Sequence, residues 1–142
     1  MTIYPTREEI EQGIAEFPPS TIHIQILFRW KEKHYVKQWK EKTTKERFVA
    51  LTHLIHAFWR HHNIKGSVIQ GHTWSYNPEH KTIFTDSETP SIISTLHELG
   101  HSLYGPSELT TCVFSIGLFK ECFPIEFDKL EWDGHMLKRI IR

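Results

Sequence analysis

The segment SIISTLHELGHSLYGPSE, residues 91–108, constrains the fold of this chain more than any other part of its sequence. Its apolar residues recur every three or four positions, which predicts an amphipathic helix with one buried face. These positions are Ile92, Leu96, Leu99 and Leu103. Thr89 and Pro90 offer an N-cap and a proline at the first helical position. Gly105-Pro106 must end the helix, because the residue before a proline avoids the α region. The chain is therefore expected to turn sharply after this helix.

The rest of the pattern predicts a small α+β domain. Helices are expected at residues 6–17, 43–65, 90–104 and 107–122, and strands at 20–30, 34–36, 73–76 and 82–85. Capping boxes, Thr6 with Glu9 and Thr43 with Glu46, mark the starts of the first two helices. The strand at 20–30 is predicted because apolar residues alternate there with polar ones. Residues 125–142 give a mixed pattern that defines no element.

Composition limits the size and class of the protein. A chain of 142 residues suits one domain, 1–142, with a real core. The chain has 17 Lys and Arg residues and 17 Asp and Glu residues, so its net charge gives no indication of a nucleic-acid or membrane partner. Neither a membrane-spanning run nor a secretion signal is visible. Cys112 and Cys122 would lie about 15 Å apart on one helix, too far to form a disulfide. We therefore expect an intracellular, cytoplasmic protein.

Two histidines on the central helix suit a metal ion. His97 and His101 are four residues apart, so they project from the same helical face one turn apart. Glu98 points beside that ion, where it can act as the general base on a water molecule. Zn²⁺ is the expected ion, because it binds imidazole readily, is redox-inert and lowers the pKa of bound water to about 7.

The stretch HELGHSLYGPSE resembles the H-E-x-x-H zinc peptidases, or zincins, and locally the WLM and SprT-like type. Short peptidases that cleave phage repressors are also similar at HELGH. The resemblance implies a zincin-like fold, in which a short twisted sheet packs against the motif helix and two or three others. It also implies zinc-dependent peptide-bond hydrolysis of a protein or peptide substrate. In the WLM pattern a third histidine directly follows Gly-Pro, whereas this chain has Ser107 and then Glu108.

Glu108 is the expected third metal ligand. A helix that starts near Ser107 places Glu108 in its first turn, at the end nearest the two histidines. Two imidazoles and one carboxylate leave a fourth position open for water. Glu121 competes, because some peptidases with two histidines and one glutamate use its spacing from the second histidine. The other candidates are His135, Glu126 and Asp133.

Three further features have both a functional and a plainer interpretation. Residues 29–47 carry eight Lys or Arg against three Glu, with Trp30, Tyr35 and Trp39 between them. This segment would suit a weak nucleic-acid contact, but a solvated connection with core aromatics is favoured. His135 is a candidate donor to the oxyanion of the reaction. The paired histidines His61-His62 and His53/His56 are of a kind that can bind metal, but His53 and His56 flank an apolar face and are expected to be packed or surface residues.

We therefore expect an intracellular zinc metallopeptidase with Glu98 and His135 as catalytic residues and with His97, His101 and Glu108 as metal ligands. The alternative is a non-catalytic protein of zincin fold that holds a structural zinc and binds nucleic acid or a protein partner. An enzyme needs an open coordination position, whereas a structural site is closed by four protein ligands.

Overall fold

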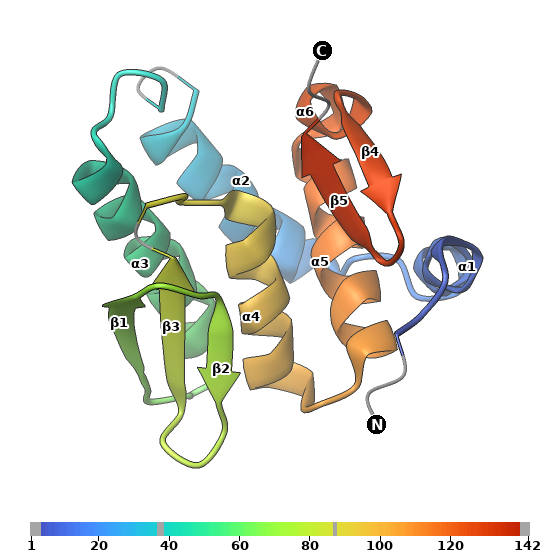
Figure 1. The fold of residues 1–142 in the computed structure, drawn as a ribbon, viewed down its shortest axis with the longest axis horizontal. Helices are drawn as coiled ribbons and strands as arrows, with labels where there is room; N and C mark the ends of the chain where they lie inside the picture. The colour runs from blue at the N-terminus through green and yellow to red at the C-terminus, as the bar shows by residue number, and fades with distance from the viewer. Residues whose placement is uncertain (1–3, 37–38, 87, 140–142) are drawn as a thin grey trace.

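Helix α4, Ile92–Tyr104, lies between a three-stranded sheet and helix α5, Glu108–Cys122 (Figure 1). The computed structural model describes residues 4–36, 39–86 and 88–139. The other helices are α1 (Arg7–Glu16), α2 (Thr21–His34), α3 (Thr44–His61) and α6 (Pro124–Asp128). Capping boxes open α1 and α3 as predicted. The small sheet and the helices around it confirm the predicted α+β class.

The three-stranded sheet has the order β1-β3-β2. Strands β2 (Ser75–Asn77) and β3 (Thr82–Asp86) pair antiparallel, which confirms the predicted strand pair. The Asn77 side chain accepts hydrogen bonds from the backbone of Glu79 and His80 and so holds the turn. Strand β1 (Ser67–Gly71), which the sequence did not define, pairs parallel to β3. Strand β2 is thus an edge strand, and it lies on the side of the sheet nearer α4 (Figure 1).

The predicted strand at residues 20–30 is wrong, because this segment forms α2. Its N-cap is Ser20, whose hydroxyl accepts a hydrogen bond from the His23 backbone. The helix buries His23, Leu27 and Trp30, which are spaced four and three residues apart, and it leaves Ile22 and Phe28 exposed. The expected strand at 34–36 is also wrong, because the chain there leaves the helix in a turn. Burial of the side chains along one face of this helix has outweighed the strand-like alternation of apolar and polar residues.

Two further boundaries differ from the sequence prediction. Helix α4 is capped by Ser91, not Thr89, because the Thr89 hydroxyl donates to the carboxylate of Asp86 instead. Pro90 consequently lies before the helix. The C-terminal residues fold into α6 and then the antiparallel hairpin of β4 (Leu130–Asp133) and β5 (Met136–Arg139). This hairpin lies over α5 and beside α1 (Figure 1).

The main core lies where α2, α3, α4 and α5 meet the sheet. Its fully buried members include Leu27, Leu54, Phe58, Trp59, Ile83, Leu96, Leu99 and Leu118. Both cysteines are buried and unbridged, as expected. No helix among residues 4–36, 39–86 and 88–139 is long and apolar enough to cross a membrane.

The aromatic residues of the basic segment 29–47 face inward. Trp30 is buried, and its indole N–H donates to the Ala50 carbonyl at 2.7 Å. Trp39 packs against Trp30 and Tyr35, and Tyr35 in turn packs edge-on against Phe123. Residues 37 and 38 of this segment lie outside the described residues. Rings that pack on one another in this way are not presented for stacking on bases.

Candidate metal centre

The short turn between α4 and α5 brings Glu108 close to His97 and His101. Gly105 ends α4 at a φ of 91°, in the region that favours glycine, and its backbone N–H donates to the His101 carbonyl. Ser107 then caps α5 through the backbone N–H of Thr110. Gly100 lets the two helices approach closely, since a Cβ there would lie 3.0 Å from the Thr111 methyl group. Glu108 therefore enters the first turn of α5 directly opposite α4.

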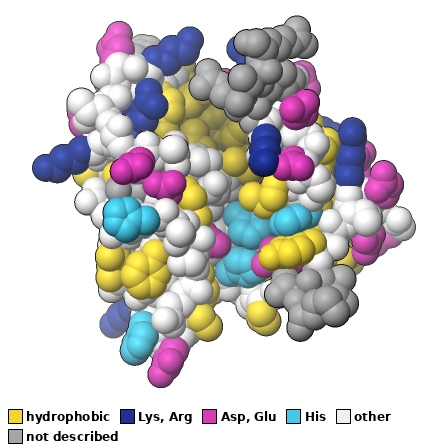
Figure 2. All heavy atoms as spheres, in the orientation of Figure 1, with side chains coloured by type: hydrophobic (Ala, Val, Ile, Leu, Met, Phe, Trp, Pro, Cys, Tyr) yellow, Lys and Arg dark blue, Asp and Glu magenta, His cyan; other side chains and the backbone are white. Residues whose placement is uncertain are grey.

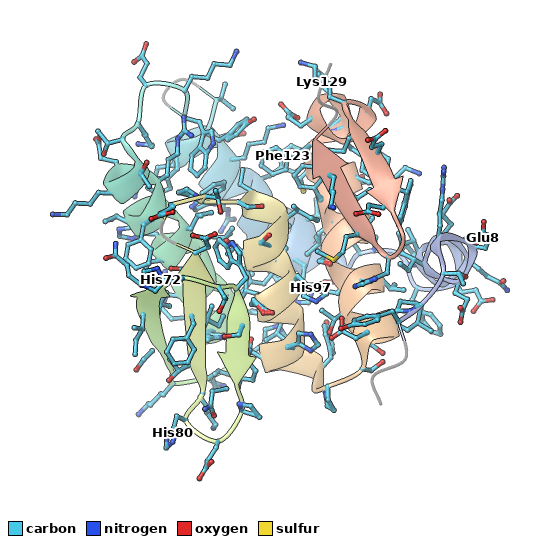
Figure 3. All side chains as sticks on the ribbon, in the orientation of Figure 1. Glu8, His72, His80, His97, Phe123 and Lys129 are labelled. Carbon is cyan, nitrogen blue, oxygen red and sulfur yellow. The ribbon has the colours of Figure 1, made fainter. Side chains whose placement is uncertain are left out.

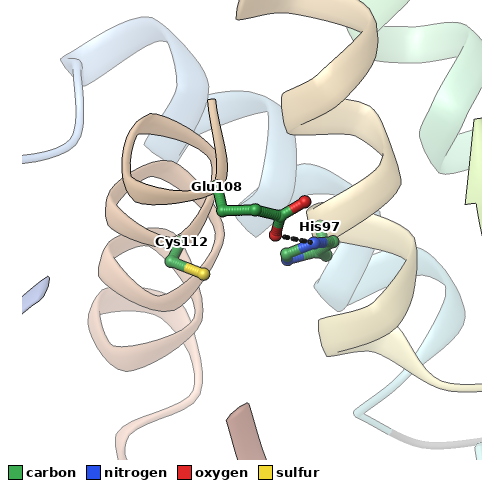
Figure 4. Close-up of side chains that lie close together, drawn as sticks. All are labelled: His97, Glu108 and Cys112. Atoms are coloured by element: carbon green, nitrogen blue, oxygen red, sulfur yellow. Dashed lines mark ion pairs between the residues drawn. The ribbon is translucent and has the colours of Figure 1, made fainter. Parts of the chain in front are cut away.

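The carboxylate of Glu108 bridges the two histidines of α4. Its Oε2 lies 3.2 Å from His97 Nε2, and its Oε1 lies 3.0 Å from His101 Nε2. All three side chains are about 15% exposed, so they are shielded yet reachable from solvent. Figure 4 shows Glu108 reaching from α5 to His97, and Figure 3 shows His97 directed into the space between the two helices.

The contacts of His101 suit either a metal ion or a second proton at this point. Its Nδ1 lies 3.0 Å from the Gly105 carbonyl, which only accepts hydrogen bonds, so Nδ1 is assigned the proton. Thr111 supports the same nitrogen at 3.3 Å. On the other side of the ring, Nε2 faces a carboxylate oxygen of Glu108 at 3.0 Å. This contact is unfavourable unless a metal ion or a second proton lies between the two atoms. In a metal-bound histidine, the ring nitrogen that does not face the metal usually donates a hydrogen bond, often to a backbone carbonyl.

Glu98 has the properties of a general base. It is 5% exposed, and its Oε2 is the one buried side-chain oxygen or nitrogen without a hydrogen-bond partner in the described part of the chain. Burial raises the pKa of Glu98 to about 7, with His101 opposing the rise and Glu108 adding to it. A carboxyl group with this pKa can take up and release a proton near neutral pH.

His97 is held in the form that a metal needs. Burial lowers its pKa; Glu108 opposes this, and His101 and His135 add to the lowering. The neutral imidazole is the metal-binding form. Imidazole and carboxylate are ligand types that zinc takes, so the residues present are chemically suited to the ion. Neither of the two groups of three ligand atoms within 4.8 Å among the described residues holds His97, His101 and Glu108 together.

His135 lies at the edge of the same site. It occupies the turn between β4 and β5, and its ring stacks on Tyr4 with the centroids 4.2 Å apart. Its influence on the pKa of His97 places it within electrostatic reach of that residue. Beside it, a hollow of about 370 Å³ is lined by Tyr4, Pro5, Glu9, Pro106, Ser107, Glu108 and Leu109. Figure 2 shows histidine side chains gathered in the middle of this face.

The other candidates for the third ligand lie elsewhere. Glu121 is exposed near the end of α5, about 20 Å along the helix from Glu108. Asp133 pairs with Lys138 on the surface of the hairpin, and Glu126 hydrogen-bonds to Tyr35. His135 belongs to neither of the two groups that, among the described residues, bring three ligand atoms within 4.8 Å of one another.

Cys112, for which the sequence favours a plain buried residue over a metal ligand, is a neighbour of the site. The two groups of ligand atoms are His97–Glu98–His101 and His97–Glu108–Cys112. The thiol is buried, faces the His135 carbonyl, and has its pKa raised to about 12 by burial, with a further rise from Glu108. Figure 4 shows it one turn below Glu108 on α5. The spacing of four residues between Glu108 and Cys112 was the available signal.

The chain matches no protein-family model, no curated protein and no solved structure. The interpretation of the site therefore depends on its own geometry and chemistry.

The geometry predicts different outcomes for two glutamates of α5. Glu108→Ala should weaken zinc binding by more than about tenfold and abolish hydrolytic activity, because it removes the carboxylate that faces both imidazoles. Glu121→Ala is the matched control on the same helix and should change neither property. Zinc affinity measured by competition with a chromogenic chelator tests both variants. The reverse pattern would place the third ligand farther along the chain.

Proposed function

We propose that this protein is a zinc-dependent peptidase that hydrolyses peptide bonds in a protein or peptide substrate. One observation carries the proposal: the Glu108 carboxylate contacts both His97 and His101, and both histidines lie within 4.8 Å of a carboxylate oxygen of the buried Glu98. The Oε2 of Glu98 has no partner among the described residues. Buried carboxylate oxygens are costly to leave unpaired, so such an atom is a candidate for a functional role.

His97, His101 and Glu108 would hold the zinc ion, and they would leave a position for water and substrate. When bound, zinc polarises a carbonyl group and makes a water molecule acidic. Glu98 would accept the proton of the attacking water on its unpaired oxygen and return it to the leaving amine. His135, at the rim, would donate a hydrogen bond to the developing oxyanion. The hollow beside Glu108 offers the substrate an approach to the site.

The proposed location is the cytoplasm. Cys112 and Cys122 are both buried thiols without a disulfide, which suits a reducing compartment. A contact between residues 29–47 and nucleic acid is not needed for the proposed activity. The inward packing of Trp30, Tyr35 and Trp39 does not favour such a contact.

A second candidate is a non-catalytic protein with a closed structural zinc site. The observation that favours it is the position of Cys112, whose sulfur lies within 4.8 Å of ligand atoms of His97 and Glu108. A thiolate there would complete four protein ligands and leave no position for water. The high pKa of this thiol opposes that arrangement in the metal-free site.

One experiment separates the two candidates. Wild-type protein and Cys112→Ser are stripped with a chelator, reloaded with one equivalent of zinc, and incubated with a mixed peptide library analysed by mass spectrometry. A peptidase should produce new peptide termini only when reloaded, and Cys112→Ser should keep full zinc content and activity. Cys122→Ser, at the other buried thiol, is the matched control. Loss of zinc in Cys112→Ser alone, with no cleavage by fully loaded wild type, would establish the structural site and refute the peptidase.

A further inference from the structure

Three histidines outside the candidate metal centre gather where the start of α2 meets the end of α3. His23 Nε2 and His62 Nε2 lie 2.8 Å apart. The His61 ring stands edge-on to His62, with centroids 4.9 Å apart, and its centroid is 6.3 Å from that of His23. We call His23, His61 and His62 the histidine cluster. Its members come from two helices that are far apart in sequence, so the fold itself creates it.

The two facing nitrogens share a hydrogen bond, and a metal ion can take the place of its proton if the rings move slightly apart. A metal–nitrogen distance of about 2.0–2.1 Å places two ligands of a tetrahedral ion about 3.3 Å apart. The observed separation is therefore within about half an ångström of that required. His62 is exposed at the C-cap of α3 and can move by this amount, whereas His23 is fixed.

His23 is built into the structure as a neutral imidazole. It is 6% exposed and packs against Phe58 and Phe114. Burial lowers its pKa to about 4, and the neighbouring His62 and His61 lower it further. An imidazole that stays neutral does not have to lose a proton before it binds a metal.

Two other features of this corner suit a cation. Helix α3 ends at His61, and the carbonyl end of a helix carries a partial negative charge. His23, but neither His61 nor His62, also lines a hollow of about 290 Å³ together with Ser20, Tyr104 and Phe114. The three histidines are not one of the groups of three ligand atoms within 4.8 Å among the described residues, so a third nitrogen joins the other two only after the exposed His61 side chain rotates.

We propose that the histidine cluster is a second metal site, which binds a borderline divalent ion such as Zn²⁺, Ni²⁺ or Cu²⁺ between α2 and α3. Imidazole is the preferred ligand of these ions. The site differs from the candidate metal centre in having no carboxylate among its three ligands, so it selects against Mg²⁺ and Ca²⁺, which require oxygen ligands. It also needs no contribution from α4 and does not depend on the proposed peptidase activity.

The test uses the full chain with the candidate metal centre disabled. The double variant His97→Ala/His101→Ala is titrated with Ni²⁺ by isothermal calorimetry, and it should bind one equivalent. Adding His62→Gln should weaken this binding by more than about tenfold, because it removes one of the two facing nitrogens. His80→Gln is the matched control: His80 is exposed in the β2–β3 turn and only its backbone is in a described hydrogen bond (Figure 3).

A second measurement covers the case in which the double variant does not fold. Wild-type protein should then bind one more equivalent of Ni²⁺ than His62→Gln, while His80→Gln should match the wild type. Equal stoichiometry and affinity in wild type and His62→Gln would overturn the proposal. Binding by the folded double variant that survives His62→Gln would overturn it as well.

Discussion

Glu98→Gln should leave the zinc content and the fold of the protein unchanged while lowering kcat by about a hundredfold to ten-thousandfold. The amide is nearly the same size as the carboxylate, so it fits the same buried position. It cannot accept a proton from the attacking water, and this is the role that the unpaired oxygen suggests. Metal analysis and steady-state kinetics on a cleaved library peptide measure the two effects separately.

The control for this variant is Glu8→Gln, which makes the same chemical change at an exposed carboxylate in the first turn of α1 (Figure 3). It should retain the wild-type kcat. Comparable hydrolysis by Glu98→Gln and wild type would show that another group is the base. Loss of zinc in Glu98→Gln would instead make Glu98 a ligand or a structural support of the site.

His97→Ala and His101→Ala should each leave the candidate metal centre unable to retain zinc after dialysis. Either change leaves one imidazole and one carboxylate, and a zinc site does not close on two protein ligands. The expected loss of affinity is about a hundredfold or more. Elemental analysis after dialysis measures it, and far-UV circular dichroism checks that the helices remain.

His72→Ala provides the matched control, because His72 is an exposed histidine near the sheet (Figure 3). It should retain one zinc per chain at the candidate metal centre. Wild-type protein without stoichiometric metal under zinc-replete conditions would contradict the whole interpretation. Zinc retained equally by His97→Ala and wild type would move the site away from α4.

Much of the site's local geometry could be predicted because it depends on short-range rules. The Gly105-Pro106 break and the helix start at Ser107 follow from backbone sterics and capping. Together they place Glu108 opposite the motif histidines. Metal binding by Cys112 was disfavoured from the sequence, because its approach to His97 depends on how closely α4 and α5 pack, and Gly100 allows that close approach.

The errors in the fold have a different origin. Residues 20–30 alternate apolar and polar side chains as a strand does, which leaves apolar side chains on both faces of a helix. They nevertheless form a helix, because Leu27 and Trp30 are then buried together in the tertiary structure. Strands β1 and β3 pair in parallel and are not joined by a tight turn, so local sequence patterns do not predict their pairing. The contact between His23 and His62 spans 39 residues and is likewise a product of the assembled helices.

The turn at Gly105 has a consequence for folding. His97, His101 and Glu108 lie within a stretch of 12 residues, on one helical hairpin. The entropy lost in closing such a short loop is small, and contacts this local form early. If His97, His101 and Glu108 bind zinc as proposed, the denatured chain would retain some affinity for the ion through the same three side chains. A ligand stabilises the native state only by the difference between its affinities for the folded and unfolded chains, so zinc would protect this protein less than its affinity alone implies. The ion would, however, help the α4–α5 hairpin to form before the sheet and the other helices assemble around it.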